Sequence, residues 1–83
     1  MLTQKRLMKE TRRVYEETVL YYTIYGTHDE AITAQDATNI VEIMLNIINT
    51  VIPSITKRKY RTELIEMRSQ CHEMLLELDL QFI

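Results

Sequence analysis

The sequence predicts an all-α fold, either an up-down-up three-helix bundle or a helical hairpin assembly, that oligomerises through apolar helix faces. The 83-residue chain holds one glycine and one proline, too few for the turns of a many-stranded β fold. Apolar residues recur at three- and four-residue steps along three stretches, which is the period of an amphipathic helix. Because the connections between these stretches are short, we expect antiparallel neighbours within a single domain, residues 1–83.

The first helix is expected over residues 3–25, where one face is apolar and the opposite face is charged. The members of the apolar face share helical spacing: Leu7, Met8, Thr11, Val14, Tyr15, Thr18, Tyr21, Tyr22 and Tyr25. Gly26 follows as the residue that ends the helix. Residues 19–25 are β-branched and aromatic and would by themselves suit a strand, but the helical pattern runs into them without a break.

The second helix is expected over residues 34–52 and is apolar nearly all round. Thr27 with Glu30 and Thr33 with Asp36 both resemble N-terminal capping boxes, so the helix begins near His28 or near residue 34. Its apolar residues are Ala37, Ile40, Val41, Ile43, Met44, Leu45, Ile47, Ile48, Val51 and Ile52. Two neighbouring helices of so short a chain would struggle to cover this surface, which predicts a homodimer or a higher oligomer.

The third helix is expected over residues 55–80, after Pro53 closes the second helix and with Ser54 or Thr56 as its cap. One set of apolar side chains recurs at alternating steps of four and three residues, which is the pattern of a heptad seam. The seam consists of Tyr60, Leu64, Met67, Cys71, Met74 and Leu78.

Charge is distributed unevenly along the chain. One basic cluster lies in the first half of the first helix and another at the start of the third: Lys5, Arg6, Lys9, Arg12, Arg13, Lys57, Arg58, Lys59 and Arg61. The acids lean towards the other end of an up-down-up bundle: Glu16, Glu17, Asp29, Glu30, Asp36, Glu73, Glu77 and Asp79. The sequence therefore predicts a molecule with a basic pole and an acidic pole.

Two interpretations of the basic pole stay open. Cations at the start of a helix oppose the helix dipole, and a sequence that breaks a local rule often does so at a functional site. The pole would then bind an anionic partner, either a nucleic-acid backbone or an acidic protein surface. Alternatively the charges aid solubility, cover apolar surface or pair with the acidic pole of another subunit.

A second apolar face is predicted on the first helix, because Tyr21 and Tyr22 cannot both face the centre of the core. Together with the outer side of the second helix it forms a candidate interface, either with another copy or with a partner. We assign to it Leu20, Tyr21, Tyr22, Ile24, Tyr25, Ile43 and Ile47.

Catalytic chemistry is not expected. Cys71 lies on the heptad seam, where a buried thiol is expected rather than a nucleophile. His72 points about 100° away from Cys71 around the helix, so the two cannot form a Cys–His pair. The two histidines and one cysteine match no metal-ligand spacing, and one glycine cannot build a phosphate-binding loop. We therefore predict no catalytic residue, no metal and no cofactor.

Composition indicates where the chain works. A single cysteine allows no intramolecular disulfide, and the N-terminal residues hold no apolar signal segment, so we expect a cytoplasmic location. The most apolar stretch, residues 40–55, is too short and too polar to span a membrane. The predicted function is a small non-enzymatic protein-interaction module that acts as a homo-oligomer. The alternative is a nucleic-acid-binding regulator that uses the basic pole.

Overall fold

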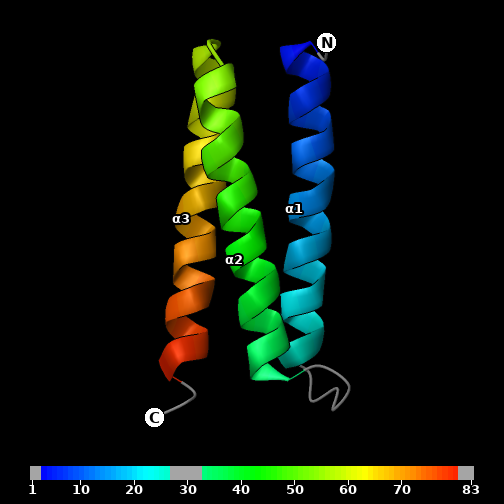
Figure 1. Ribbon diagram of the computed structural model, residues 1–83, viewed down its shortest axis with the longest axis vertical. Coiled ribbons are helices and arrows are strands. Elements are labelled where there is room, and N and C mark those ends of the chain that lie inside the picture. The colour runs from blue at the N-terminus through cyan, green and yellow to red at the C-terminus, as the bar shows by residue number, and fades with distance from the viewer. Residues whose placement is uncertain (1–2, 27–32, 81–83) are drawn as a thin grey trace.

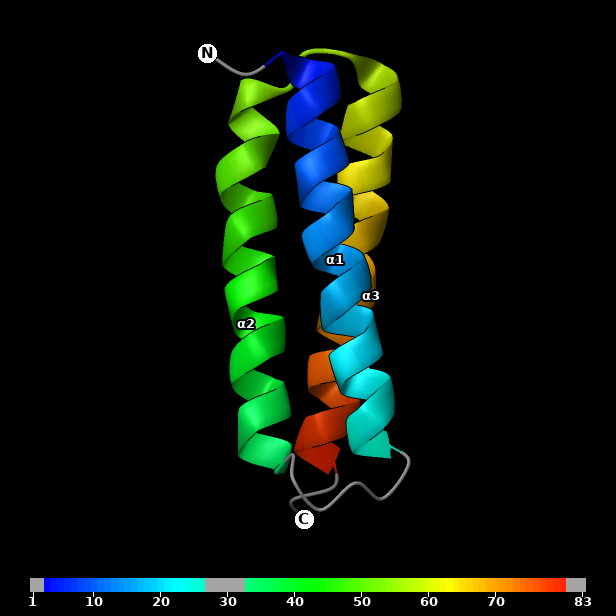
Figure 2. The ribbon, with the colours of Figure 1, turned by 90° about the vertical axis from the view of Figure 1, so that its right-hand side faces the viewer.

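The computed structural model describes residues 3–26 and 33–80, and in this part of the chain it contains three α-helices and no strand. The helices are α1 (Gln4–Gly26), α2 (Ala34–Val51) and α3 (Arg58–Leu80), and a short 3-10 helix, η1 (Ile52–Ser54), follows α2. They lie side by side along a longest dimension of 40 Å (Figure 1). α2 runs opposite to α1 and α3 (Figure 2), which confirms the predicted three-helix, up-down-up arrangement.

The start of α2 is fixed by a capping box. The Asp36 backbone N–H donates to the Thr33 hydroxyl at 3.1 Å, and the Thr33 N–H donates to the Asp36 carboxylate at 3.4 Å. These bonds satisfy two amide groups at the helix start, which have no partner within the helix. Of the two predicted start signals, this one is confirmed, while Thr27, His28 and Glu30 lie outside the described residues.

The backbone preferences of single residues shape the connection from α2 to α3. Pro53 occupies the first turn of η1, where its missing N–H leaves no bond unmade. Ile55 is extended and completely buried. α3 begins at Arg58, later than the predicted residue 55, so the predicted caps Ser54 and Thr56 both lie before its N-cap position.

The hydrophobic core is built mainly from one face of α2 and the seam of α3. α2 packs closely against both other helices, whereas α1 and α3 approach each other less closely. The buried residues of α2 and α3 are Ala37, Val41, Met44, Ile48, Val51, Leu64, Met67, Cys71, Met74 and Leu78. The predicted heptad seam is thus confirmed, with Tyr60, its first member, half-buried against the core.

α1 buries two threonines beside Met8. Thr11 and Thr18 are almost completely covered, and their hydroxyls donate to the carbonyl groups of Leu7 and Val14 at 2.8 and 2.9 Å. Each hydroxyl therefore keeps a hydrogen bond inside its own helix, so its burial carries little penalty. Small buried side chains at these positions allow α1 to lie close to the core.

Only one face of α2 is buried within the single chain. Ile43 is 55% exposed, and Ile40 and Ile47 are half-buried. The expectation that neighbouring helices cannot cover α2 on all sides is thus met, and an apolar strip of α2 stays open to solvent. No helix in residues 3–26 and 33–80 is long and apolar enough to cross a membrane.

We expect Met67→Asp to unfold the chain. Met67 is 5% exposed in the centre of the seam, and an unpaired carboxylate there destabilises the fold by roughly 3 kcal/mol or more. Leu76→Asp is the matched control, because Leu76 lies on the same helix and is 61% exposed. Circular dichroism during urea unfolding measures both variants. Equal stability of the two would contradict this assignment of the core.

Candidate interaction surfaces

The two basic clusters lie at the same end of the bundle, which we call the basic end. Figure 1 shows the start of α1 beside the connection between α2 and α3. Gln4 joins them: its amide oxygen accepts from the N–H groups of Thr56 and Lys57 at 3.0 and 3.2 Å, and its amide nitrogen donates to the Thr56 hydroxyl at 2.7 Å. Residues more than fifty positions apart are thereby held together.

Four of the nine predicted basic residues are engaged within the chain. Arg12 pairs with Glu63. Arg13 lies between Glu10 and Glu17, 3.1 Å from each. Arg61 donates to the Ile55 carbonyl at 3.2 Å, and the Lys57 ammonium lies 5.7 Å from the centre of the Tyr60 ring.

The other five basic residues are exposed and carry the open charge of the basic end. Among the described residues, none of them has an acidic group within ion-pair distance. They are Lys5, Arg6, Lys9, Arg58 and Lys59. Of the nine residues predicted to bind an anion, these five are therefore exposed and outside the ion pairs and contacts described above.

The opposite end of the bundle, which we call the acidic end, holds the start of α2 and the last turns of α3 (Figure 1). Asp36, Glu73, Glu77 and Asp79 are exposed there. Glu16 and Glu17 lie nearer the middle of α1, and Asp29 and Glu30 lie outside the described residues. The bundle is thus bipolar over the part of the chain that the structure describes.

Polar bridges join α1 to α3 at three levels. Gln4 binds Thr56 at the basic end, Arg12 binds Glu63 below it, and the Tyr22 hydroxyl donates to Glu77 near the acidic end. The Arg12 pair is bidentate, with N···O distances of 2.5 and 2.9 Å. Hydrogen bonding to Arg12 lowers the pKa of Glu63, although partial burial opposes the shift.

The α1–α2 face is one of the open apolar surfaces of the bundle, since Ile65 and Leu76 of α3 are exposed elsewhere. Leu20 and Ile43 are 60% and 55% exposed, and a groove of about 240 Å³ runs between the two helices. The residues that line this groove are Val14, Glu17, Thr18, Tyr21, Ile40, Ile43, Met44 and Ile47. Ile43 and Ile47 also border a neighbouring hollow of about 300 Å³ on α2. Helical spacing places Ile24 on the same side of α1 as Tyr21, whereas Leu20, the residue before Tyr21, is turned about 100° away from it and does not line the groove.

Of the seven predicted interface residues, Tyr21, Ile43 and Ile47 line the groove. Tyr22 packs against the core and its hydroxyl donates to Glu77 on α3, so its side chain lies away from this groove. Helical geometry turns Tyr22 about 100° away from Tyr21, and the structure shows that Tyr21 is the tyrosine on the open side. The side chain of Tyr25 lies outside the described part of the chain.

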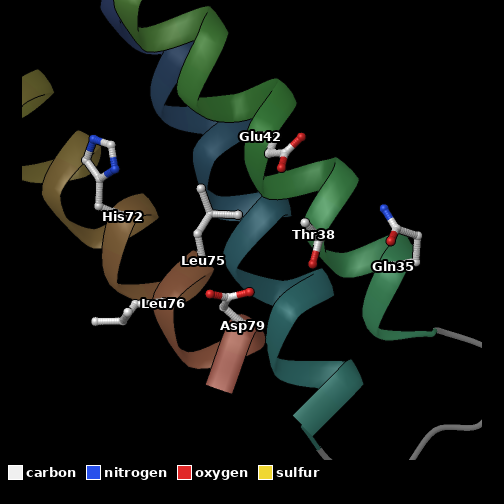
Figure 3. A pocket seen from close by; sticks show the side chains of 7 residues that line it. All are labelled: Gln35, Thr38, Glu42, His72, Leu75, Leu76 and Asp79. Carbon is white, nitrogen blue, oxygen red and sulfur yellow. The ribbon is translucent and has the colours of Figure 1, made fainter. Parts of the chain in front are cut away.

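A second groove, which the sequence did not indicate, lies between α2 and α3. It has a volume of about 610 Å³ and is lined by Gln35, Thr38, Glu42, His72, Leu75, Leu76 and Asp79. In Figure 3, Leu75 points from α3 towards α2, whereas Leu76 points away from α2. Only the pairing of α2 with α3 brings these residues together. In the sequence, the residues that each helix contributes resemble an ordinary solvent-exposed strip.

Cys71, the cysteine of the heptad seam, lies in the core, as the sequence predicted. Cys71 is completely buried, and this burial raises the pKa of its thiol to about 11. The thiol is therefore protonated at neutral pH and has no access to a substrate. His72 is exposed, on the side of α3 that faces the second groove. In residues 3–26 and 33–80, no group of three or more His, Cys, Asp or Glu residues is arranged to hold a metal ion.

Comparison with protein-family models, curated proteins and solved structures gave no match to this chain. The fold itself defines a class, the up-down-up three-helix bundle.

We expect Glu63→Gln to destabilise the protein at neutral pH but not in acid. Because the folded-state pKa of Glu63 is lowered, the ion pair stabilises the fold above the ordinary glutamate pKa of about 4.3. This stabilisation is lost as the pH falls through the lowered pKa of Glu63. Both side chains are partly exposed, at 42% and 30%, so the expected loss is about 0.5–1 kcal/mol at pH 7.

Urea unfolding at pH 7 and pH 3 measures this difference. Glu66→Gln is the control, since Glu66 is an exposed acid one turn further along α3. A loss that is the same at both pH values would show that Glu63 acts through packing rather than through its charge.

Proposed function

We propose that this chain is a small non-enzymatic protein-interaction module that acts as a homo-oligomer through its α1–α2 face. The observation that carries this proposal is the groove between α1 and α2, in which Tyr21 of α1 lies opposite the exposed Ile43 of α2. Adaptors, inhibitors, chaperones and immunity-type factors all act by binding of this kind. The single cysteine, Cys71, is free and allows no intramolecular disulfide, which is usual in a reducing compartment, so we propose the cytoplasm.

The arrangement of the exposed apolar residues supports an interface rather than chance exposure. Single apolar side chains on a surface are common and need no explanation. Ile43, however, lines one groove together with the half-buried Tyr21, Ile40 and Ile47. This continuity gives a partner one apolar patch instead of isolated contacts, and the aromatic ring of Tyr21 supplies a residue type enriched at interfaces.

The size of the chain allows such an interface. A stable complex buries about 800 Å² on each partner, which is roughly one seventh of the 5925 Å² accessible surface of the described chain. One side of a three-helix bundle can supply this area. Burial of an exposed apolar side chain contributes about 1.5–3 kcal/mol, so the open residues of the α1–α2 face are a sufficient driving force.

We expect Ile43→Glu to convert the oligomer into a monomer. A carboxylate in the centre of the α1–α2 face would be buried without a partner, so the dissociation constant should rise at least about tenfold. Sedimentation velocity over a range of protein concentrations measures the change.

Ile65→Glu is the matched control, because Ile65 is 47% exposed on α3, away from this face. The control should assemble like the unaltered chain. A monomer at every concentration for the unaltered chain would overturn the proposal.

The basic end favours a second candidate function, the binding of a nucleic-acid backbone. Gln4 holds the two basic clusters together, and five exposed cations there have no acidic group within ion-pair distance among the described residues. Lysine and arginine on one surface neutralise phosphates and release counterions. The candidate residues with available charge are Lys5, Arg6, Lys9, Arg58 and Lys59.

If this second function holds, binding of duplex DNA or RNA should be measurable at about 50 mM salt and should weaken steeply as salt rises. The double variant Arg58→Gln, Lys59→Gln should reduce the slope of log K against log salt by about 2. Arg68→Glu is the control: it changes the net charge by the same amount but lies on the middle of α3. Equal effects of the two variants, or no binding at low salt, would exclude the basic end as a nucleic-acid site.

A further inference from the structure

Two stripes of side chains make up the α1–α2 face, one on each helix. Residues three or four positions apart lie on the same side of a helix. The α1 stripe, defined from Glu17 and Tyr21 in the groove, consists of Arg6, Glu10, Arg13, Glu17, Tyr21 and Ile24. The α2 stripe, defined from Ile40, Ile43 and Ile47 in the groove, extends to Asp36 and Thr50.

The charges of these stripes are separated by the apolar centre. Within the α1 stripe, Arg13 is held between Glu10 and Glu17. Arg6 is in the first turn of α1, at the basic end of the face, and Asp36 is in the first turn of α2, at the acidic end. Both side chains are exposed, and between them lie Tyr21, Ile43 and Ile47. The face therefore has one apolar middle and two ends of opposite charge.

We infer that the α1–α2 face takes a second copy of this chain in the reversed orientation, with the basic end of each copy beside the acidic end of the other. This inference rests on the proposed function, because it names the partner and the orientation for the same face. A symmetric dimer repeats every contact, so each favourable or unfavourable pair occurs twice.

Charge complementarity selects the reversed orientation. A parallel dimer would bring Arg6 near Arg6 and Asp36 near Asp36, and like charges across an interface oppose binding. The reversed dimer turns the Arg6 end of one copy towards the Asp36 end of its partner. The clusters on α3 act in the same direction, since Arg58 and Lys59 lie at the basic end and Glu73 and Asp79 at the acidic end.

The orientation can be measured with labels at the two ends of the bundle. Ser54→Cys places a thiol at the basic end and Asp79→Cys places one at the acidic end, and both positions are exposed. The natural Cys71 is buried and its thiol pKa is about 11, so it should take up no label. Pulsed electron resonance on spin-labelled chains then gives the distance between copies.

In the reversed dimer, two Ser54→Cys labels should be separated by about the 40 Å length of the bundle. A mixture of Ser54→Cys and Asp79→Cys chains should add a distance clearly shorter than 40 Å from the mixed dimers, because their two labels lie at the same end of the pair. The opposite pattern, short between Ser54 labels and long in the mixture, would overturn the inference but leave the proposed function standing. A monomer in sedimentation would overturn both.

Charge exchange gives a second measurement. Arg6→Glu should weaken the dimer by about tenfold, because the altered contact occurs twice in a symmetric dimer. Adding Asp36→Arg in the same chain should restore the affinity, since the two charges are then exchanged. Asp36→Arg alone is the control for the loss of the Thr33 capping box, with circular dichroism measuring whether α2 is retained. Failure of the second change to restore what the first removed would contradict the pairing of opposite ends. Dimer affinity of the unaltered chain should also fall as salt rises.

Discussion

The buried face of α2 is the constraint on which the rest of the structure depends. Val41, Met44 and Ile48 are almost wholly covered, and this one helix packs closely against both neighbours. A chain of this size forms only a small core, because small domains bury a modest share of their surface. α2 must therefore be central, and its position determines which surfaces of α1 and α3 are left over for other roles.

Polar bridges link α1 to the α3 region, beside the apolar packing of α1 against the core. Gln4, Arg12 and Tyr22 each bind a residue of the α3 region, at three successive levels. Each bridge is partly exposed and individually weak, but together they fix one alignment of two parallel helices. This alignment brings the two basic clusters to one end, so the bipolar charge of the molecule is a consequence of how α1 is attached.

The open apolar face and the bipolar charge are connected by geometry. The antiparallel pairing of α1 and α2 places Arg6 and Asp36 at opposite ends of the same face, with Ile43 between them. Apolar burial then supplies the driving force for assembly, while charge selects the orientation. The second groove, between α2 and α3, lies on another side of the bundle and would stay accessible in such a dimer.

The sequence alone determined the three helices and their buried sides, because these follow from local periodicity: the heptad seam from Leu64 to Leu78 and the capping box at Thr33 were both readable from residue spacing. It also indicated that α2 could not be covered by its neighbours. Only the tertiary structure decided which cations are occupied, that Tyr22 turns to α3 while Tyr21 stays on the open side, and that α3 starts at Arg58. Pairings such as Arg12 with Glu63 join residues about fifty positions apart, and no local pattern encodes the rotation of one helix against another.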